Sequence, residues 1–199
     1  MRVLGLTGNF GCGKSTVAAM FQETGIPVVD ADRISRQVTA AGSPVYREIV
    51  RAFGEEILLP DGAIDRRRLG ELVFADAQHR TRLEAITHPA ILEALREALA
   101  VLARDGHRVA LVEAALIHES GRKGLIGEVI SVRCDGEVQL RRVTARDGIS
   151  TAQAADRIRA QMDPGDKERR SDYVIDNSGS MEETRRQVEQ LAQTLRRRD

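Results

Sequence analysis

The sequence predicts an α/β protein in which a parallel sheet is interrupted by a helical insertion. Short apolar runs that read as buried strands lie at residues 2–6, 26–29, 108–112, 129–132 and 173–175. The first two flank a helical pattern at 15–23, and strand–helix–strand units of about thirty residues are typical of parallel sheets. The stretch 32–104 contains no clear buried strand, so we expect a helical insertion there.

Helical patterns account for most of the remaining chain. Within the insertion they cover 34–39, 44–53, 66–74, 77–87 and a segment from Pro89 to Gly106. Proline suits a first helical position, so we expect a new helix to begin at Pro89. After the fourth strand, residues 138–170 are Arg-rich and helical with a break at 163–165, and 182–198 form a last amphipathic helix.

The composition excludes several classes of partner. Apolar residues make up 42% of the 199, which supplies a sizeable core, and 30 basic residues balance 30 acidic ones. With no net charge and 3% aromatic residues, we expect neither nucleic acid nor a membrane as partner. The two cysteines have no metal-ligand spacing and no apolar run reaches about 18 residues, so we expect a cytoplasmic protein with reduced thiols. A monomer is compatible with the sequence, which leaves the oligomeric state open.

A glycine-rich turn after the first strand has the spacing of a phosphate-binding loop. Gly8, Gly11, Gly13, Lys14 and Ser15 satisfy the pattern G-x-x-x-x-G-K-[ST]. Glycines let backbone N–H groups approach a polyphosphate, and the helix beginning near Lys14 directs its unpaired N–H groups at the same place. Lys14 is expected to reach the β- and γ-phosphates of ATP, and the Ser15 hydroxyl to bind Mg²⁺.

The residue between two of these glycines, Cys12, has two interpretations. A loop rich in N–H donors can favour its thiolate, or Cys12 is a small residue that the loop tolerates. We favour the second interpretation.

Two acidic residues follow the second strand. Asp30 and Asp32 lie at the carboxyl edge of the predicted sheet, where ligands of parallel sheets bind. They can orient Mg²⁺ or accept a proton from an attacking hydroxyl. They can equally be a helix N-cap and a first-turn acid, and the spacing leaves both interpretations open.

A phosphate loop alone fits switches, motors and small kinases. The chain has no Asn-Lys-x-Asp motif for guanine, and the strand at 109–112 is followed by Glu113 rather than the Asp typical of motors. Two alternatives to the interpretation below remain: a kinase of the nucleoside-monophosphate type, and a regulatory ATPase that uses the helical insertion as a partner surface.

The motifs together resemble the dephospho-coenzyme A kinase family. The resemblance rests on six stretches that span nearly the whole chain in order: Leu6–Thr16, Asp30–Arg36, Asp65–Phe74, His88–Ile91, Gln139–Asp147 and Asp172–Gly179. It implies a three-layer P-loop kinase fold with a five-stranded parallel sheet. It also implies a nucleotide-binding core (1–31, 105–137 and 171–199), a helical acceptor domain (32–104) and an Arg-rich lid (138–170). The implied reaction transfers the γ-phosphoryl group of ATP to the ribose 3′-hydroxyl of dephospho-CoA, with Mg²⁺.

The resemblance also implies roles for single residues. The implied catalytic residues are Lys14, Asp32 and Arg142. The implied nucleotide-binding residues are Gly8, Gly11, Cys12, Gly13, Lys14, Ser15, Thr16, Arg146 and Asn177. Asp30, Asp32 and His88 are expected on the side of the acceptor, and Glu113 is expected to bind Mg²⁺ through water.

One stretch departs from the family pattern. The family usually has Asp where this chain has Glu113, Pro where it has Ala115, and an apolar residue where it has His118. A glutamate can still reach Mg²⁺ through water, and we expect His118 to be an exposed change. These departures bear on substrate fit and rate more than on the class of reaction.

Overall fold

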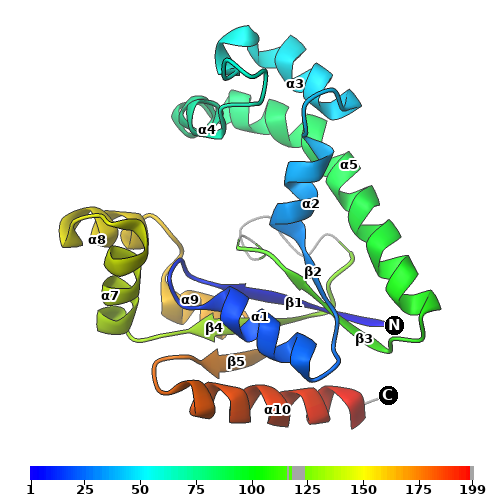
Figure 1. The fold of residues 1–199 in the computed structure, drawn as a ribbon, viewed down its shortest axis with the longest axis vertical. Helices are drawn as coiled ribbons and strands as arrows, with labels where there is room; N and C mark the ends of the chain where they lie inside the picture. The colour runs from blue at the N-terminus through cyan, green and yellow to red at the C-terminus, as the bar shows by residue number, and fades with distance from the viewer. Residues whose placement is uncertain (116, 118–123, 198–199) are drawn as a thin grey trace. The chain divides into compact units, whose positions relative to one another are not determined.

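The chain divides into two compact units. The structure, a computed structural model, describes residues 1–115, 117 and 124–197 (Figure 1). Unit 1 comprises residues 1–30 and 99–199, and unit 2 comprises residues 31–98. Within the described residues, no helix is both long enough and apolar enough to cross a membrane.

Unit 1 contains a five-stranded sheet in which every neighbouring pair is parallel. The strands are β1 (Arg2–Gly8), β2 (Val28–Asp30), β3 (Val109–Glu113), β4 (Glu128–Arg133) and β5 (Tyr173–Asp176), in the order β2-β3-β1-β4-β5. The predicted α/β class and its five parallel strands are therefore confirmed. The chain builds β2 and β3 on one side of the central strand β1 and then crosses to β4 and β5 on the other, and open parallel sheets bind ligands at such a switch point.

The sheet alternates its side chains between two buried faces. Leu4 and Leu6 of β1, with Leu111 and Ile130 on the neighbouring strands, belong to one apolar cluster. Residues of α1 (Lys14–Glu23) and α10 (Met181–Arg197) complete this cluster, and the two helices pack against each other. Both faces of the central strands are buried, as expected for parallel strands.

Three short helices follow β4 in unit 1. They are α7 (Gly136–Asp147), α8 (Thr151–Arg159) and α9 (Pro164–Arg169). Ser150 and Gln153 form a capping box that starts α8, and Asp163 caps α9 with Pro164 at its first position. The predicted break at 163–165 is thus the beginning of α9.

Unit 2 is helical. It contains α2 (Ala31–Val38), α3 (Pro44–Phe53), the 3₁₀ turn η1 (Glu55–Ile57), α4 (Arg66–Ala75) and most of α5 (Ala77–Arg104), whose last residues belong to unit 1. Its core gathers Ile49, Phe53, Ile57, Ile64 and Leu69. Two of these helices begin with residue types that commonly cap helices. Ser43 caps α3 and accepts from the Tyr46 N–H, and Asp65 caps α4 and accepts from the N–H groups of Arg67 and Arg68.

Two predictions about helix limits were wrong. The helix expected to begin at Pro89 is instead continuous with the one before it, and Pro89 lies inside α5. A proline here removes one backbone hydrogen bond, but Leu83 and Ile86 on the preceding turns pack against the unit 2 core. Tertiary packing therefore sustains the helix through the proline. The helix expected from residue 34 begins at Ala31, so Asp32 lies in its first turn.

Candidate active site

The turn between β1 and α1 has a backbone that only glycine fits at several positions. Gly11 and Gly13 have φ angles of 83° and 85°. A Cβ atom on Gly13 would lie 2.2 Å from Nδ2 of Asn177, and one on Gly8 would lie 2.6 Å from the carbonyl oxygen of Val132. The loop is therefore closely packed against the ends of β4 and β5.

The first turn of α1 has backbone N–H groups that no side-chain cap takes up. Gly13 is the N-cap and has no side chain to accept hydrogen bonds from the following residues. The N–H groups of Lys14, Ser15 and Thr16 belong to this first turn, which in helices is a site for anions. This geometry agrees with the use of residues 8–16 as a phosphate-binding loop.

A carboxylate connects the loop to β3. Oε1 of Glu113 lies 3.0 Å from Nζ of Lys14 and accepts a hydrogen bond of 3.1 Å from the Ser15 hydroxyl. The Lys14 and Glu113 side chains are 16% and 12% exposed, so this ion pair is shielded from solvent. Glu113 ends β3 and lies in register with Asp30 at the end of β2. The Glu113 carboxylate, an ammonium and a hydroxyl thus meet at one edge of the sheet, with Asp30 on the neighbouring strand.

Asn177 holds the loop from the other side. This residue is 2% exposed, and its Nδ2 donates to the carbonyl oxygen of Cys12 at 2.8 Å. Its Oδ1 accepts from the Thr184 hydroxyl, and its carbonyl oxygen accepts from Nη1 of Arg142 at 2.9 Å. Asn177 therefore binds the loop and the candidate catalytic Arg142 together, with its side-chain amide occupied by protein contacts.

The segment after α8 contacts the first half of the loop. The Phe10 N–H donates to Oε1 of Gln161 at 2.6 Å, and Nδ2 of Asn9 donates to the carbonyl oxygen of Met162 at 3.1 Å. Nε2 of Gln139 in α7 donates to the Phe10 carbonyl oxygen at 2.7 Å. The sequence assigns neither glutamine a role, although Gln139 begins one of the family stretches, because their partners lie 151 and 129 residues away.

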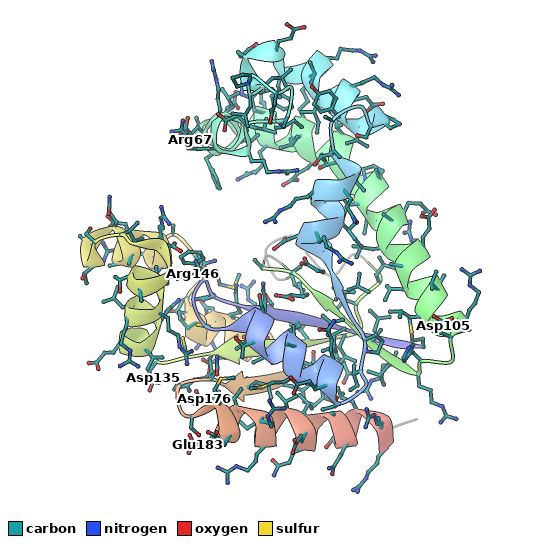
Figure 2. The ribbon with its side chains drawn as sticks, viewed as in Figure 1. Arg67, Asp105, Asp135, Arg146, Asp176 and Glu183 are labelled. Atoms are coloured by element: carbon teal, nitrogen blue, oxygen red, sulfur yellow. The ribbon has the colours of Figure 1, made fainter. Side chains whose placement is uncertain are left out.

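Arg146 lies over the same stretch of loop. Arg146 is labelled in Figure 2. Its guanidinium is 4.3 Å from the centre of the Phe10 ring, and its Nε donates to Asp147 at 2.8 Å. The hydrogen bond from Arg146, with further attraction from Arg157, lowers the pKa of the Asp147 carboxyl. Arg146 is about half exposed, so its cation is available to a ligand.

The other candidate residues belong to unit 2. Asp32 lies in the first turn of α2, and His88 lies within α5 next to Pro89. In the same unit Nη2 of Arg66 donates to the Thr39 hydroxyl at 2.8 Å. Partial burial and the positive charge of Arg36 lower the pKa of Arg66. The neighbouring guanidinium groups of Arg36 and Arg66 together favour the binding of an anion.

Of the three departures from the family pattern, two fall on described residues. Glu113 makes the contacts given above. The carbonyl oxygen of Ala115 accepts from the Thr7 hydroxyl at 3.1 Å and from Nζ of the buried Lys167 at 3.4 Å. His118 lies outside the described residues, so the expectation that it is exposed stays a prediction.

Comparison with known proteins gives a consistent result. Residues 2–183 match the family model described as dephospho-CoA kinase. A protein named dephospho-CoA kinase from Geobacter sulfurreducens is 48% identical over 191 residues, which cover 96% of this chain and 97% of that protein.

Solved structures agree with this result. A crystal structure of the Thermus thermophilus protein TT1252 superposes with a TM-score of 0.86 at 34% identity, covering 97% of this chain and 96% of the other. A dephospho-CoA kinase from Campylobacter jejuni superposes with a TM-score of 0.70 at 28% identity, covering 98% of each chain. A shikimate kinase from Acinetobacter baumannii, at a TM-score of 0.53 and 20% identity over 100% of this chain and 95% of the other, shares the fold alone.

Proposed function

Because this chain belongs to the dephospho-CoA kinase family, we propose that it transfers the γ-phosphoryl group of ATP to the ribose 3′-hydroxyl of dephospho-CoA, giving CoA and ADP. The single observation in the structure that best supports this proposal is the contact of Glu113 with both Lys14 and Ser15 at the amino end of α1. A phosphate loop, a fixed cation and a carboxylate are the parts that phosphoryl transfer requires.

On the side of the nucleotide, residues 8–16 bind the phosphates. The backbone N–H groups of the loop and the ammonium of Lys14 stabilise charge that spreads over the phosphoryl oxygens in the transition state. Asn177 is a positioning residue. Its side-chain amide holds the carbonyl oxygen of Cys12, and its own carbonyl oxygen holds the guanidinium of Arg142. Arg142 and Arg146 then supply guanidinium groups to the phosphates when the lid closes.

The residues at the sheet edge fit a magnesium ion. Mg²⁺ prefers hydroxyl, carboxylate and phosphate oxygens, and the Ser15 hydroxyl and Glu113 carboxylate share one hydrogen bond there. Ser15 would hold the ion directly and Glu113 through water, with Asp30 beside them in register. When bound, the ion neutralises charge on the transferring phosphate.

On the side of the acceptor, unit 2 supplies the binding groups. Asp32 accepts the proton of the 3′-hydroxyl as that oxygen attacks the γ-phosphorus; an ordinary aspartate is already ionised at neutral pH and needs only reach. Arg36 and Arg66 provide positive charge for the diphosphate of the acceptor, and His88 contacts the acceptor. The division into a core (1–31, 105–137, 171–199), an acceptor domain (32–104) and a lid (138–170) follows from these roles.

The test is ADP production from magnesium-ATP with dephospho-CoA, with AMP and with no acceptor. We expect rapid ADP formation only with dephospho-CoA. Equal or faster turnover with AMP would instead indicate a nucleoside-monophosphate kinase. Hydrolysis at the same rate without any acceptor would indicate a regulatory ATPase and contradict the proposal.

A further inference from the structure

The only two cysteines of the chain meet beside the phosphate loop. Sγ of Cys12 and Sγ of Cys134 are 2.9 Å apart, although 122 residues separate them in the sequence. Both are free thiols, and they are 3% and 9% exposed. None of the roles proposed above requires a thiol at either position.

Each cysteine is fixed by a different element. Cys12 lies in the phosphate loop, where its N–H donates to the Asn9 carbonyl oxygen at 3.0 Å and its carbonyl oxygen accepts from Asn177. Cys134 directly follows β4, and the next residue, Asp135, is the N-cap of α7. A bond between the sulfurs would therefore join the loop to the end of a neighbouring strand.

The two thiols differ in exposure and in the charge around them. The hydrogen bond between them lowers the pKa of Cys134, and the positive charge of Arg142 lowers it further. The same contact, together with burial, raises the pKa of Cys12. Cys134 is the more exposed of the two, at 9% against 3%, so a small oxidant in solvent meets it first, and Cys12 lies in position to react with the product.

We propose that Cys12 and Cys134 form an oxidative modification site whose oxidant is a hydroperoxide. The Cys134 thiolate attacks one peroxide oxygen and breaks the O–O bond, giving a sulfenic acid and, with hydrogen peroxide, hydroxide that takes up a proton to become water. Sγ of Cys12 then attacks the sulfenic sulfur and forms the S–S bond. Its proton leaves with the departing hydroxide as a second water, so two thiols are oxidised while one peroxide is reduced.

The disulfide changes the geometry of the phosphate loop. A disulfide bond is about 2.05 Å long, so the two sulfurs must approach each other by somewhat less than ~1 Å. The backbone on the loop side carries the N–H groups of residues 12–16, and a misplacement of about 1 Å in a binding site can lower the rate by about 10²-fold. This consequence rests on the proposed binding of ATP by the loop, whereas formation of the disulfide does not.

The experiment treats the purified full-length protein with hydrogen peroxide and measures two quantities. Intact mass and thiol titration should show the loss of two hydrogens and of both free thiols. Isothermal titration with magnesium-ATP should show an affinity lowered by about 10-fold or more, and dithiothreitol should restore both. In Cys134→Ser, which changes a residue outside the nucleotide-binding machinery, ATP affinity should match the reduced wild type and resist peroxide. In Cys12→Ser no mass loss of two hydrogens should occur.

Three results would overturn the proposal. The first is stable oxygen adducts on the wild type without any loss of two hydrogens. The second is a disulfide that leaves ATP affinity unchanged. The third is an equal loss of ATP binding by Cys134→Ser on oxidation. Because the mass measurement needs no enzymatic activity, failure of the kinase assignment would leave the test of disulfide formation intact.

Discussion

Glu113 is the residue that connects β3 to the phosphate loop. It departs from the family pattern, and its carboxylate lies against both Lys14 and Ser15, while its water-mediated contact with Mg²⁺ stays a prediction. The departure therefore preserves a negative charge at the point where the cation and the hydroxyl meet.

Replacement of this charge should impair the use of magnesium. Glu113→Gln removes the partner of a shielded lysine, and we expect the Mg²⁺ concentration for half-maximal activity to rise, or kcat to fall, by about 10- to 100-fold. Titration of activity with Mg²⁺ at saturating ATP measures this. Glu113→Asp is the matched control that keeps the charge, and it should recover most of the activity. Equal behaviour of the two variants would refute a role for the carboxylate charge.

Asp32 should matter for chemistry and not for nucleotide binding. Asp32→Asn keeps the size of the side chain but removes the proton acceptor, so we expect kcat to fall by about 10²–10⁴-fold with little change in KM for ATP. Steady-state kinetics with varied ATP and dephospho-CoA measure both constants. Asp30→Asn is the comparison and should be less severe. If Asp32→Asn were nearly fully active, the proton acceptor would have to be sought elsewhere.

Residues with local constraints were predictable from the sequence, and residues with distant partners were not. Gly11 and Gly13 are recognisable because a positive φ at fixed spacing leaves glycine as the natural choice. Gln161, Gln139 and Cys134 have no such local requirement. Their contacts join positions 151, 129 and 122 residues apart, and only the folded sheet brings those positions together.

At the scale of elements, two glycines with the same backbone conformation separate the effect of close packing in the phosphate loop from the effect of backbone strain alone. Gly13 and Gly106 have nearly the same φ, 85° and 86°, but a Cβ atom at Gly106 meets nothing within 4 Å. Gly106→Ala should cost only the backbone strain of about 1–3 kcal/mol and should leave ATP affinity unchanged.

Gly13→Ala adds the clash with Asn177 to the same strain. We therefore expect a larger loss of stability and a loss of ATP binding, measured by chemical denaturation and by nucleotide titration. Equal effects of the two substitutions on both measurements would show that the close approach to Asn177 has no part in the function of the loop.

Helix α5 gives a second test at this scale. Pro89 lies inside the helix, where its ring prevents one backbone hydrogen bond. Pro89→Ala should raise the free energy of unfolding by up to about 3 kcal/mol, measured by denaturation. Glu97→Ala, at an exposed position of the same helix, is the control and should stay within about 0.5 kcal/mol. A Pro89→Ala protein no more stable than the wild type would contradict the idea that the proline weakens α5.

Element types were more predictable than element limits. Strands follow from short apolar runs, and their parallel pairing follows from the intervening helices. The continuity of α5 could not be read from local pattern, since a proline usually marks a first turn and only packing of Leu83 and Ile86 on the unit 2 core outweighs it.

For the whole molecule, the two compact units correspond to two kinds of chemistry. Unit 1 holds the glycine loop, Lys14 and the carboxylate of Glu113, whereas unit 2 holds Asp32, His88 and the neighbouring Arg36 and Arg66. The phosphate loop was predictable from the sequence, because the spacing of its glycines before Lys14 and Ser15 is typical of phosphate binding. The identity of the acceptor was not predictable in this way, because a surface that recognises one particular alcohol has no comparable local pattern. The acceptor is inferred from the family.

The central claim is the identity of the phosphate acceptor, and the most direct measurement follows the phosphoryl group itself. ATP labelled in its γ-phosphate is incubated with the protein, Mg²⁺ and dephospho-CoA, and the products are separated and analysed by mass and phosphorus spectroscopy. The account predicts that the label appears on the ribose 3′-oxygen of CoA, in equal amount to the ADP formed. Label recovered only as inorganic phosphate, with dephospho-CoA unchanged, would contradict it.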